Sequence, residues 1–133
     1  MRLESKVALI SGGARGIGAA VARIFAREGA SVGIADVLEE EGRRLEEQIT
    51  EAGGQAFFLR LDVTSDSDWE RVVEAVVARF GKLDVLVNNA GILHRATVEE
   101  TTPEAWDQLM DINAKGVFLG TRAAIPAMRE AGG

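Results

Sequence analysis

The chain has 133 residues, of which 47% are hydrophobic and 27% charged, and its formal net charge is −6. This length and balance predict one globular domain with enough chain to bury a core. The absence of Cys excludes disulfides, thiolate metal sites and a cysteine nucleophile, and the absence of Tyr excludes a phenol as general acid or base.

The charge and hydropathy patterns argue against two classes of partner. An acidic chain with no block of basic residues is a poor candidate for binding nucleic acid. No apolar run approaches the roughly 18 residues that span a bilayer, and the N-terminal stretch is too short and too charged for a signal peptide. We therefore expect no nucleic-acid partner, no membrane insertion and a cytoplasmic location.

Four short apolar runs predict β-strands. Each has about the length of a strand and no polar face, which is typical of a parallel sheet covered on both sides. In chain order the runs are Val7–Ile10, Ala30–Ala35, Ala56–Leu61 and Leu83–Val87.

Apolar residues at helical spacing fill the segments between these runs. The stripes are Ile17, Val21, Ile24 and Phe25, then Leu38, Leu45 and Ile49, and most clearly the residues from Trp69 to Phe80. Thr102 and Pro103 predict the start of a last helical region that reaches about Glu130, bent near Gly116, Gly120 and Pro126. Trp69 and Trp106 lie on apolar helix faces, and we expect both in the core. Arg43 is spaced to pair with Glu39 and with Glu47.

This alternation of elements predicts an α/β fold, a Rossmann-type doubly wound parallel sheet. The four strands are expected in the order 3-2-1-4 with flanking helices, and the sheet is truncated before a fifth strand.

The loop after the first strand carries glycines at Gly12, Gly16 and Gly18 and leads into a helix. Glycine lets the backbone turn tightly and lie close to a ligand, and the helix N-terminus offers free N–H groups to a pyrophosphate. A glycine-rich turn with no ligand is the alternative.

Asp36 lies at the end of the second strand, eighteen residues after Gly18. A carboxylate at about this distance accepts hydrogen bonds from the ribose hydroxyls of an adenosine and repels a 2′-phosphate. It therefore favours NAD over NADP, although the guanidinium of Arg15 could meet a 2′-phosphate. A P-loop is excluded because Ala19 and Ala20 follow Gly18, while a methyl-donor site remains a weaker competitor.

Four motifs in order resemble the classical short-chain dehydrogenase/reductase family over the whole chain. They are the Ser11–Gly18 loop, Asp62 and Val63 after the third strand, the Asn88–Gly91 segment after the fourth, and Asn113 in the last helical region. Ser11 stands where the family usually has Thr and keeps the hydroxyl. The resemblance implies that residues 1–133 are the NAD-binding N-terminal part of one dehydrogenase domain.

The resemblance also implies a role for each matching residue. The residues that would bind NAD are Ser11, Gly12, Arg15, Gly16, Ile17, Gly18, Asp36, Asp62, Val63, Asn89, Ala90 and Gly91. Among them, Asp36 would hold the adenosine ribose and Asp62 the adenine amino group. Asn88 would brace the sheet, and Asn113 would be the catalytic Asn that holds a water in a proton relay. His94 is expected to be a solvated loop residue, and no metal site is predicted.

The family's reaction transfers a hydride between the nicotinamide and a secondary alcohol or ketone, with a Tyr as general acid/base, a nearby Lys and a Ser. This chain has no Tyr, so we expect it to be the cofactor-binding half of such an oxidoreductase and inactive alone, with weak NAD binding. A non-catalytic dinucleotide-binding or interaction module is the alternative, and a methyltransferase-like module a weaker one.

Only the resemblance to the family indicates a substrate class and an oligomeric state. The acidic stretch from Asp36 to Gly42 and the last nine residues look most like NAD-linked secondary-alcohol and hydroxysteroid dehydrogenases. The resemblance implies a homodimer or homotetramer formed through helices that include the last one. The spacing of Gly116 and Gly120 would permit close packing between helices.

Overall fold

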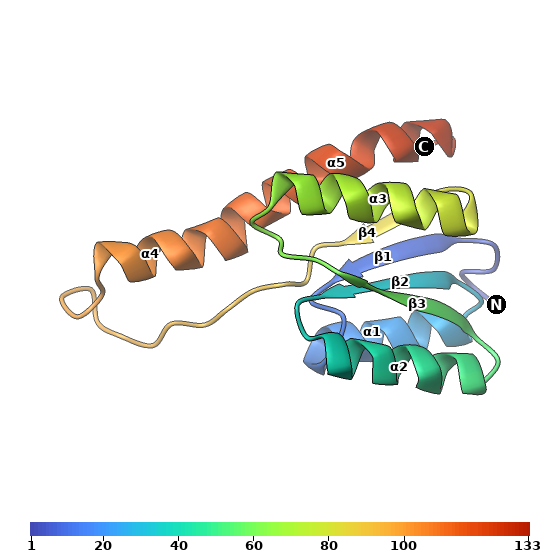
Figure 1. The fold of residues 1–133 in the computed structure, drawn as a ribbon, viewed down its shortest axis with the longest axis horizontal. Helices are drawn as coiled ribbons and strands as arrows, with labels where there is room; N and C mark the ends of the chain where they lie inside the picture. The colour runs from blue at the N-terminus through green and yellow to red at the C-terminus, as the bar shows by residue number, and fades with distance from the viewer.

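The computed structural model describes all 133 residues as alternating strands and helices (Figure 1). The strands are β1 (Val7–Ser11), β2 (Ser31–Asp36), β3 (Gln55–Arg60) and β4 (Val85–Val87). The helices are α1 (Gly16–Arg27), α2 (Glu39–Glu51), α3 (Asp66–Phe80), α4 (Pro103–Met110) and α5 (Gly116–Glu130), with the π-helical segment η1 (Asp111–Lys115) between the last two.

The four strands form one parallel sheet in the order β3-β2-β1-β4, which confirms the predicted α/β topology. Helices α1 and α2 cover one face, and α3 and α5 cover the other (Figure 1). Because the four strands are parallel, their carboxyl ends lie on the same side of the sheet, and the loops that follow them meet there. β4 is shorter than predicted because Leu83 and Asp84 precede its first pairing with β1.

Successive strand residues supply two separate cores. Leu9 packs with Trp69, Val72 and Val76 beneath α3 and α5, whereas Ile10 belongs to the core beneath α1 and α2. Side chains alternate between the faces of a strand, and both faces of β1 are covered, so all of its residues are buried. Trp69 is fully buried, as predicted.

The apolar stripe predicted on the first helix is wrong in part. Ile17 and Ile24 are 77% and 42% exposed, and α1 instead buries Gly18, Ala19 and Ala22. Small side chains let the helix axis lie close to the sheet, and Val21 and Phe25 of the predicted stripe pack partly against the same core.

The last helical region is continuous from α4 through η1 to α5. The Thr102 hydroxyl accepts the Ala105 N–H at 3.1 Å and Pro103 opens the helix, as the sequence predicts. The helix changes from α to π geometry in η1, which ends immediately before the predicted bend at Gly116. Pro126, another predicted bend, lies inside α5.

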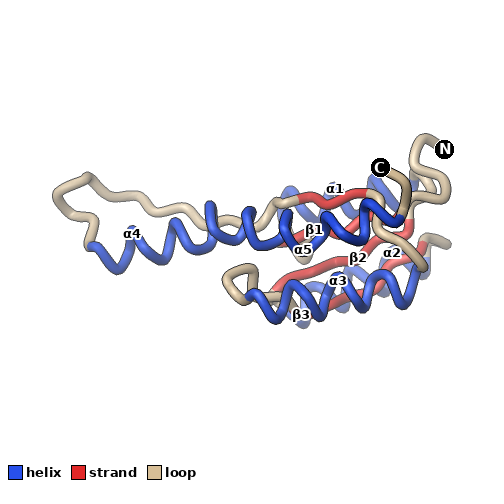
Figure 2. Tube along the Cα trace, turned by 90° about the horizontal axis from the view of Figure 1, so that it is seen from above, coloured by secondary structure: helices blue, strands red, loops and turns tan.

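α4 and the loop before it extend beyond the sheet (Figure 1; Figure 2). No residue of α4 is buried, and Trp106 is 56% exposed, which contradicts its predicted place in the core. The apolar face that carries it has no sheet beneath it. None of the helices combines the length and apolar composition that crossing a bilayer would need.

Gly116 and Gly120 pack within the chain. A Cβ on Gly120 would lie 2.6 Å from the Trp69 ring, and a Cβ on Gly116 would lie 3.0 Å from Val63. Their spacing therefore serves the close approach of α5 to α3 and to the turn after β3, and it gives no support for a contact between protomers. On α2, Arg43 pairs with Glu39 at 3.0 Å and not with Glu47.

Asp84 ties the start of β4 to the start of β1. Its Oδ2 accepts the Val7 N–H at 2.8 Å, its own N–H donates to the Val7 carbonyl at 2.9 Å, and Lys82 Nζ lies 3.1 Å from the same carboxylate. Burial raises the pKa of Asp84, but the Val7 N–H and Lys82 outweigh it and hold the pKa below its ordinary value of 3.8.

We expect Asp84→Asn to lower the free energy of unfolding by about 1–3 kcal/mol at neutral pH, because a charge-assisted hydrogen bond to a backbone N–H is weakened. A carboxylate whose folded pKa is depressed stabilises the fold above its unfolded pKa, and this contribution is lost as the pH falls through the folded pKa. Urea unfolding should therefore show the wild-type advantage shrinking as the pH falls below the ordinary value of 3.8. An advantage that is independent of pH would contradict this role for Asp84.

Candidate functional site

A hollow of about 410 Å³ lies where the carboxyl ends of the strands meet. Its walls come from the loop after β1, the end of β2, the turn after β3, the loop after β4, and η1. Ten of the predicted cofactor-binding residues line it, namely Gly12, Arg15, Gly16, Ile17, Asp36, Asp62, Val63, Asn89, Ala90 and Gly91. The topology thus brings together residues that are far apart in the sequence.

Glycine is needed at Gly12, Gly16 and Gly18 for different physical reasons. Gly12 and Gly16 have φ of +63° and +58°, the left-handed region that favours glycine. A Cβ on Gly12 would lie 2.8 Å from the Ala90 Cα, and a Cβ on Gly18 would collide with the Gly12 carbonyl. At Gly16 no atom lies within 4 Å of where a Cβ would be, and Gly16 lines the hollow.

Ser11 lies behind the hollow and joins two loops. Its buried hydroxyl accepts the N–H groups of Asn89 and Ala90, each at 3.1 Å, and is 3.4 Å from the Val87 carbonyl, to which it donates. The hydroxyl that matched the family's usual Thr therefore contacts protein backbone in this structure.

Asn89 completes this link from the opposite side. Its Nδ2 donates to the carbonyls of Ser11 and Gly12 at 3.1 and 3.0 Å. Asn88, in contrast, donates to the Thr121 hydroxyl on α5 at 3.2 Å. The two neighbouring amides thus point to different partners, and Asn88 braces the end of β4 against a helix, as predicted.

Asp36 is oriented by backbone N–H groups. Its Oδ2 accepts from Ala14 at 3.1 Å and its Oδ1 accepts from Leu38 at 3.2 Å. Each carboxylate oxygen can accept further hydrogen bonds, so Asp36 can also accept from a ligand in the hollow. Arg15 lies on the same wall, is exposed and has no ion-pair partner.

Asp62 and Val63 form the turn between β3 and α3. The Asp62 Oδ1 accepts from both the N–H and the hydroxyl of Thr64, at 2.9 and 2.7 Å. The Val63 carbonyl accepts from the buried Trp69 indole at 3.0 Å. The position of both residues is therefore set by α3 and its first turn.

Asn113 lies in the middle of η1 and binds the loop after β4 through its side chain. Its Oδ1 accepts the Ile92 N–H and its Nδ2 donates to the Ile92 carbonyl, both at 2.8 Å. Isolated π-helical turns occur often at functional sites. Both polar atoms of this side chain are used to hold Ile92, and Asn113 itself does not line the hollow.

Five lining residues were not predicted from the sequence: Val37, Leu38, Leu61, Ile92 and Ile112. Val37, Leu38, Leu61 and Ile92 follow the end of a strand and lie close to predicted residues, and this position along the chain could have indicated them. Ile112 comes from η1, which the sequence did not reveal. His94 is exposed and lies outside the hollow, as expected.

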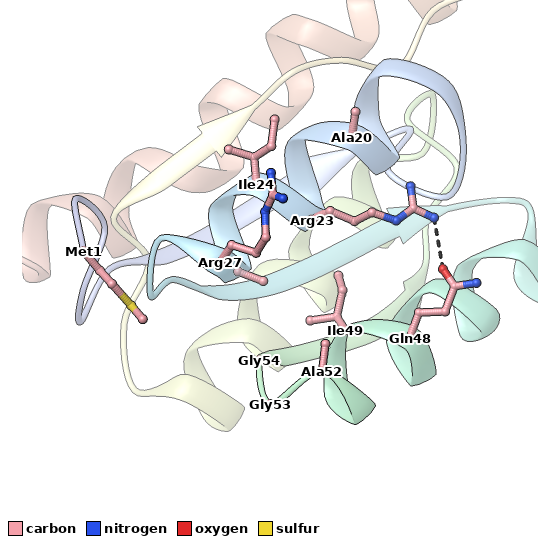
Figure 3. A pocket seen from close by; sticks show the side chains of 11 residues that line it. Met1, Ala20, Arg23, Ile24, Arg27, Gln48, Ile49, Ala52, Gly53 and Gly54 are labelled. Atoms are coloured by element: carbon pink, nitrogen blue, oxygen red, sulfur yellow. Dashed lines mark hydrogen bonds between the residues drawn. The ribbon is translucent and has the colours of Figure 1, made fainter.

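A larger hollow of about 760 Å³ lies between α1 and α2, on the outer surface of one helical layer (Figure 3). Ile49 and Ala52 line it, and the Arg23 guanidinium donates to Gln48 Oε1 across it at 3.0 Å. It contains none of the residues at the strand ends. The smaller hollow is the candidate site because the open edge of a parallel α/β sheet is where ligands bind.

The sheet order and the glycine loop at its carboxyl edge define a Rossmann-type α/β protein. The family model described as short chain dehydrogenase matches residues 6–133. The chain therefore belongs to the short-chain dehydrogenase/reductase family, as the sequence motifs indicated.

Its relatives are dehydrogenases. The chain is 51% identical to trans-4-hydroxycyclohexanecarboxylate dehydrogenase of Sinomonas cyclohexanicum, over 99% of this chain and 53% of that protein. It is 46% identical to cyclopentanol dehydrogenase of Comamonas testosteroni, over 98% and 52%. It is 47% identical to 3-alpha-(or 20-beta)-hydroxysteroid dehydrogenase of Mycobacterium tuberculosis, over 98% and 49%.

Among solved structures, a double mutant of a Serratia marcescens short-chain dehydrogenase/reductase matches with a TM-score of 0.92 and 33% identity. The match covers 96% of this chain and 53% of that one. The chain thus spans about half the length of the relatives it matches.

We expect Ser11→Ala to destabilise the fold by about 1–3 kcal/mol, because it leaves the half-buried Ala90 N–H without its acceptor and leaves the Asn89 N–H with the Val87 carbonyl alone. Ser11→Thr keeps the hydroxyl and is the matched control. Urea unfolding followed by circular dichroism measures both. A Ser11→Ala variant as stable as the wild type, or less destabilised than Ser11→Thr, would contradict this role of the hydroxyl.

Proposed function

We propose that this chain binds NAD in the hollow at the strand ends and serves an oxidoreductase that acts on a secondary alcohol or ketone. The observation that carries this proposal is the placement of Asp36. Its carboxylate is fixed by two backbone N–H groups on the wall that also holds the glycine loop. An oriented carboxylate there suits ribose hydroxyls and disfavours a 2′-phosphate.

The residues present fit a dinucleotide. Gly16 lines the hollow at the N-terminus of α1, and no atom lies within 4 Å of where its Cβ would be. A helix N-terminus with exposed N–H groups suits a pyrophosphate. In this proposal Gly12, Arg15, Gly16 and Ile17 hold the pyrophosphate, and Ser11 and Gly18 keep that loop in place.

The adenosine half would be held by the other walls. Asp36 would accept from the ribose and Asp62 from the adenine amino group, with Val63 beside the base. Asn89, Ala90 and Gly91 would line the adenosine side. The bound nicotinamide supplies the acceptor or donor of the hydride, and the residues of this chain bind and orient the cofactor.

The proton transfer of the reaction needs groups that these 133 residues do not provide, since the sequence has no Tyr. We propose that the Tyr, Lys and Ser of the family lie outside these residues and that the chain alone has negligible turnover. In that reaction Asn113 would be the catalytic Asn of this chain. Its side chain is bonded to the main chain of Ile92 in this structure.

The relatives favour a cyclic substrate. Their names specify a hydroxycyclohexanecarboxylate, cyclopentanol and a hydroxysteroid, all of which carry a secondary alcohol on or next to a ring. We propose a cyclic secondary alcohol or the matching ketone as the substrate class. The second candidate function is a non-catalytic dinucleotide-binding module, which the hollow with its glycine loop and Asp36 would equally support.

We propose that the chain self-associates through α4 and α5, because both helices carry exposed apolar side chains. Trp106, Met110, Val117, Phe118 and Ile125 are each 38% exposed or more. A homodimer formed through these helices would cover this apolar area.

Calorimetric titration with NAD and NADP tests the cofactor proposal. We expect weak binding of NAD, weaker binding of NADP, and a loss of about tenfold or more in NAD affinity for Asp36→Ala, because hydrogen bonds to a charged group are removed. Asp107→Ala on α4, an exposed carboxylate outside the hollow, is the control. NADP binding as tight as NAD binding, or an unchanged Asp36→Ala variant, would overturn the proposal.

A further inference from the structure

The turn that carries Asp62 is held by a second carboxylate, that of Asp68 on α3. The Asp62 N–H donates to Asp68 Oδ2 at 2.9 Å. The Asp68 N–H in turn donates to the Ser65 hydroxyl at 3.1 Å, which caps the helix. The turn and the first turn of α3 are thus joined by hydrogen bonds in both directions.

Two arginines extend this contact into a closed ring. The Arg71 guanidinium lies 3.5 Å from Asp68 Oδ1 and donates to the Arg60 carbonyl at 2.7 Å, while Arg60 Nη1 lies 3.8 Å from Asp68 Oδ2. The ring therefore runs from the end of β3 through Arg71 and Asp68 to the Asp62 N–H. Both guanidiniums are about half exposed, so each ion pair alone contributes little. The shorter bond to the Asp62 N–H carries most of the constraint.

The electrostatics of the ring keep Asp68 ionised. The Asp62 N–H, with Arg71 and Arg60, holds the pKa of Asp68 below its ordinary value, against a smaller effect of burial that raises it. A charged acceptor forms a stronger hydrogen bond than a neutral one. Asp68 therefore remains a strong acceptor for the Asp62 N–H throughout the neutral range.

The consequence lies in what remains free on Asp62. Its backbone N–H is taken by Asp68, and its Oδ1 accepts twice from Thr64. Its Oδ2 has no partner within the chain, and Asp62 lines the hollow. The turn thus presents one free carboxylate oxygen whose direction is fixed by the other contacts of the same residue.

We propose that Asp68 is a positioning residue that sets the direction of the Asp62 carboxylate and thereby the selectivity of the hollow for a base with an exocyclic amino group. This inference rests on the proposed binding of NAD. Asp68 does not line the hollow and acts only through Asp62. A free carboxylate oxygen accepts from an amino group and repels a carbonyl at the same place, so the turn selects adenine over hypoxanthine.

The test compares NAD with nicotinamide hypoxanthine dinucleotide, in which a carbonyl replaces the adenine amino group. The ratio of the two dissociation constants is measured by calorimetric titration of the wild type, Asp68→Ala and Asp68→Asn. We expect the wild type to favour NAD, and Asp68→Ala to lose about tenfold in NAD affinity while its affinity for the analogue changes little. Asp68→Asn should lie between them, because a neutral amide accepts a weaker hydrogen bond.

Asp66→Ala is the matched control. Asp66 also lies in the first turn of α3, but its carboxylate pairs with Arg122 on α5 at 2.9 Å. Its loss removes the same negative charge from the helix N-terminus without touching the Asp62 turn. We therefore expect it to leave the ratio between NAD and the analogue unchanged, whatever it does to stability.

The outcomes separate this inference from the proposed function. Failure of the wild type to bind NAD would overturn the proposed function, and this inference with it. If the wild type binds NAD but does not distinguish it from the analogue, NAD binding stands and the role of the Asp62 carboxylate is overturned. If the wild type discriminates and both Asp68 variants keep the full ratio, Asp68 is not the positioning residue. Should Asp68→Ala fail to fold, Asp68→Asn decides.

Discussion

The hydrogen bonds between the ends of β1 and β4 are the constraint on which the candidate site depends. The Ser11 hydroxyl accepts two N–H groups from the loop after β4, and the Asn89 amide returns two bonds to the backbone of the loop after β1. The loops can approach this closely only because Gly12 and Gly18 have no side chain. One wall of the hollow is therefore shaped by contacts within the chain, so the proposed dinucleotide would need to order little of it.

Polar side chains in and near the hollow are oriented in the same way, by hydrogen bonds to backbone groups. Asp36 accepts from two main-chain N–H groups, Asp68 from one, and Asn113 binds both polar main-chain atoms of Ile92. These contacts leave the side chains few alternative positions. Asp36 is oriented without a basic partner, whereas Asp68 also contacts Arg60 and Arg71.

The sheet order and the main walls of the hollow could be predicted because they follow from local patterns: apolar runs for the strands and glycines for the loop. The errors arise where tertiary packing decides. Ile17 and Ile24 look like a core stripe, but α1 packs through Ala19 and Ala22 because the sheet demands a close approach. Trp106 looks buried, but no element lies beneath α4. The π-helical turn and the ring around Asp68 depend on contacts between segments that no local pattern reveals.

Because α4 extends beyond the sheet, few contacts connect it to the rest of the chain. The arm formed by α4 and its preceding loop has no buried residue and joins the body through α5 and through the two hydrogen bonds between Asn113 and Ile92. Asn113 lies in η1, and Ile92 is on the wall of the hollow. The same side chain therefore sets both where the arm leaves the body and where the main chain of Ile92 lies beside the hollow.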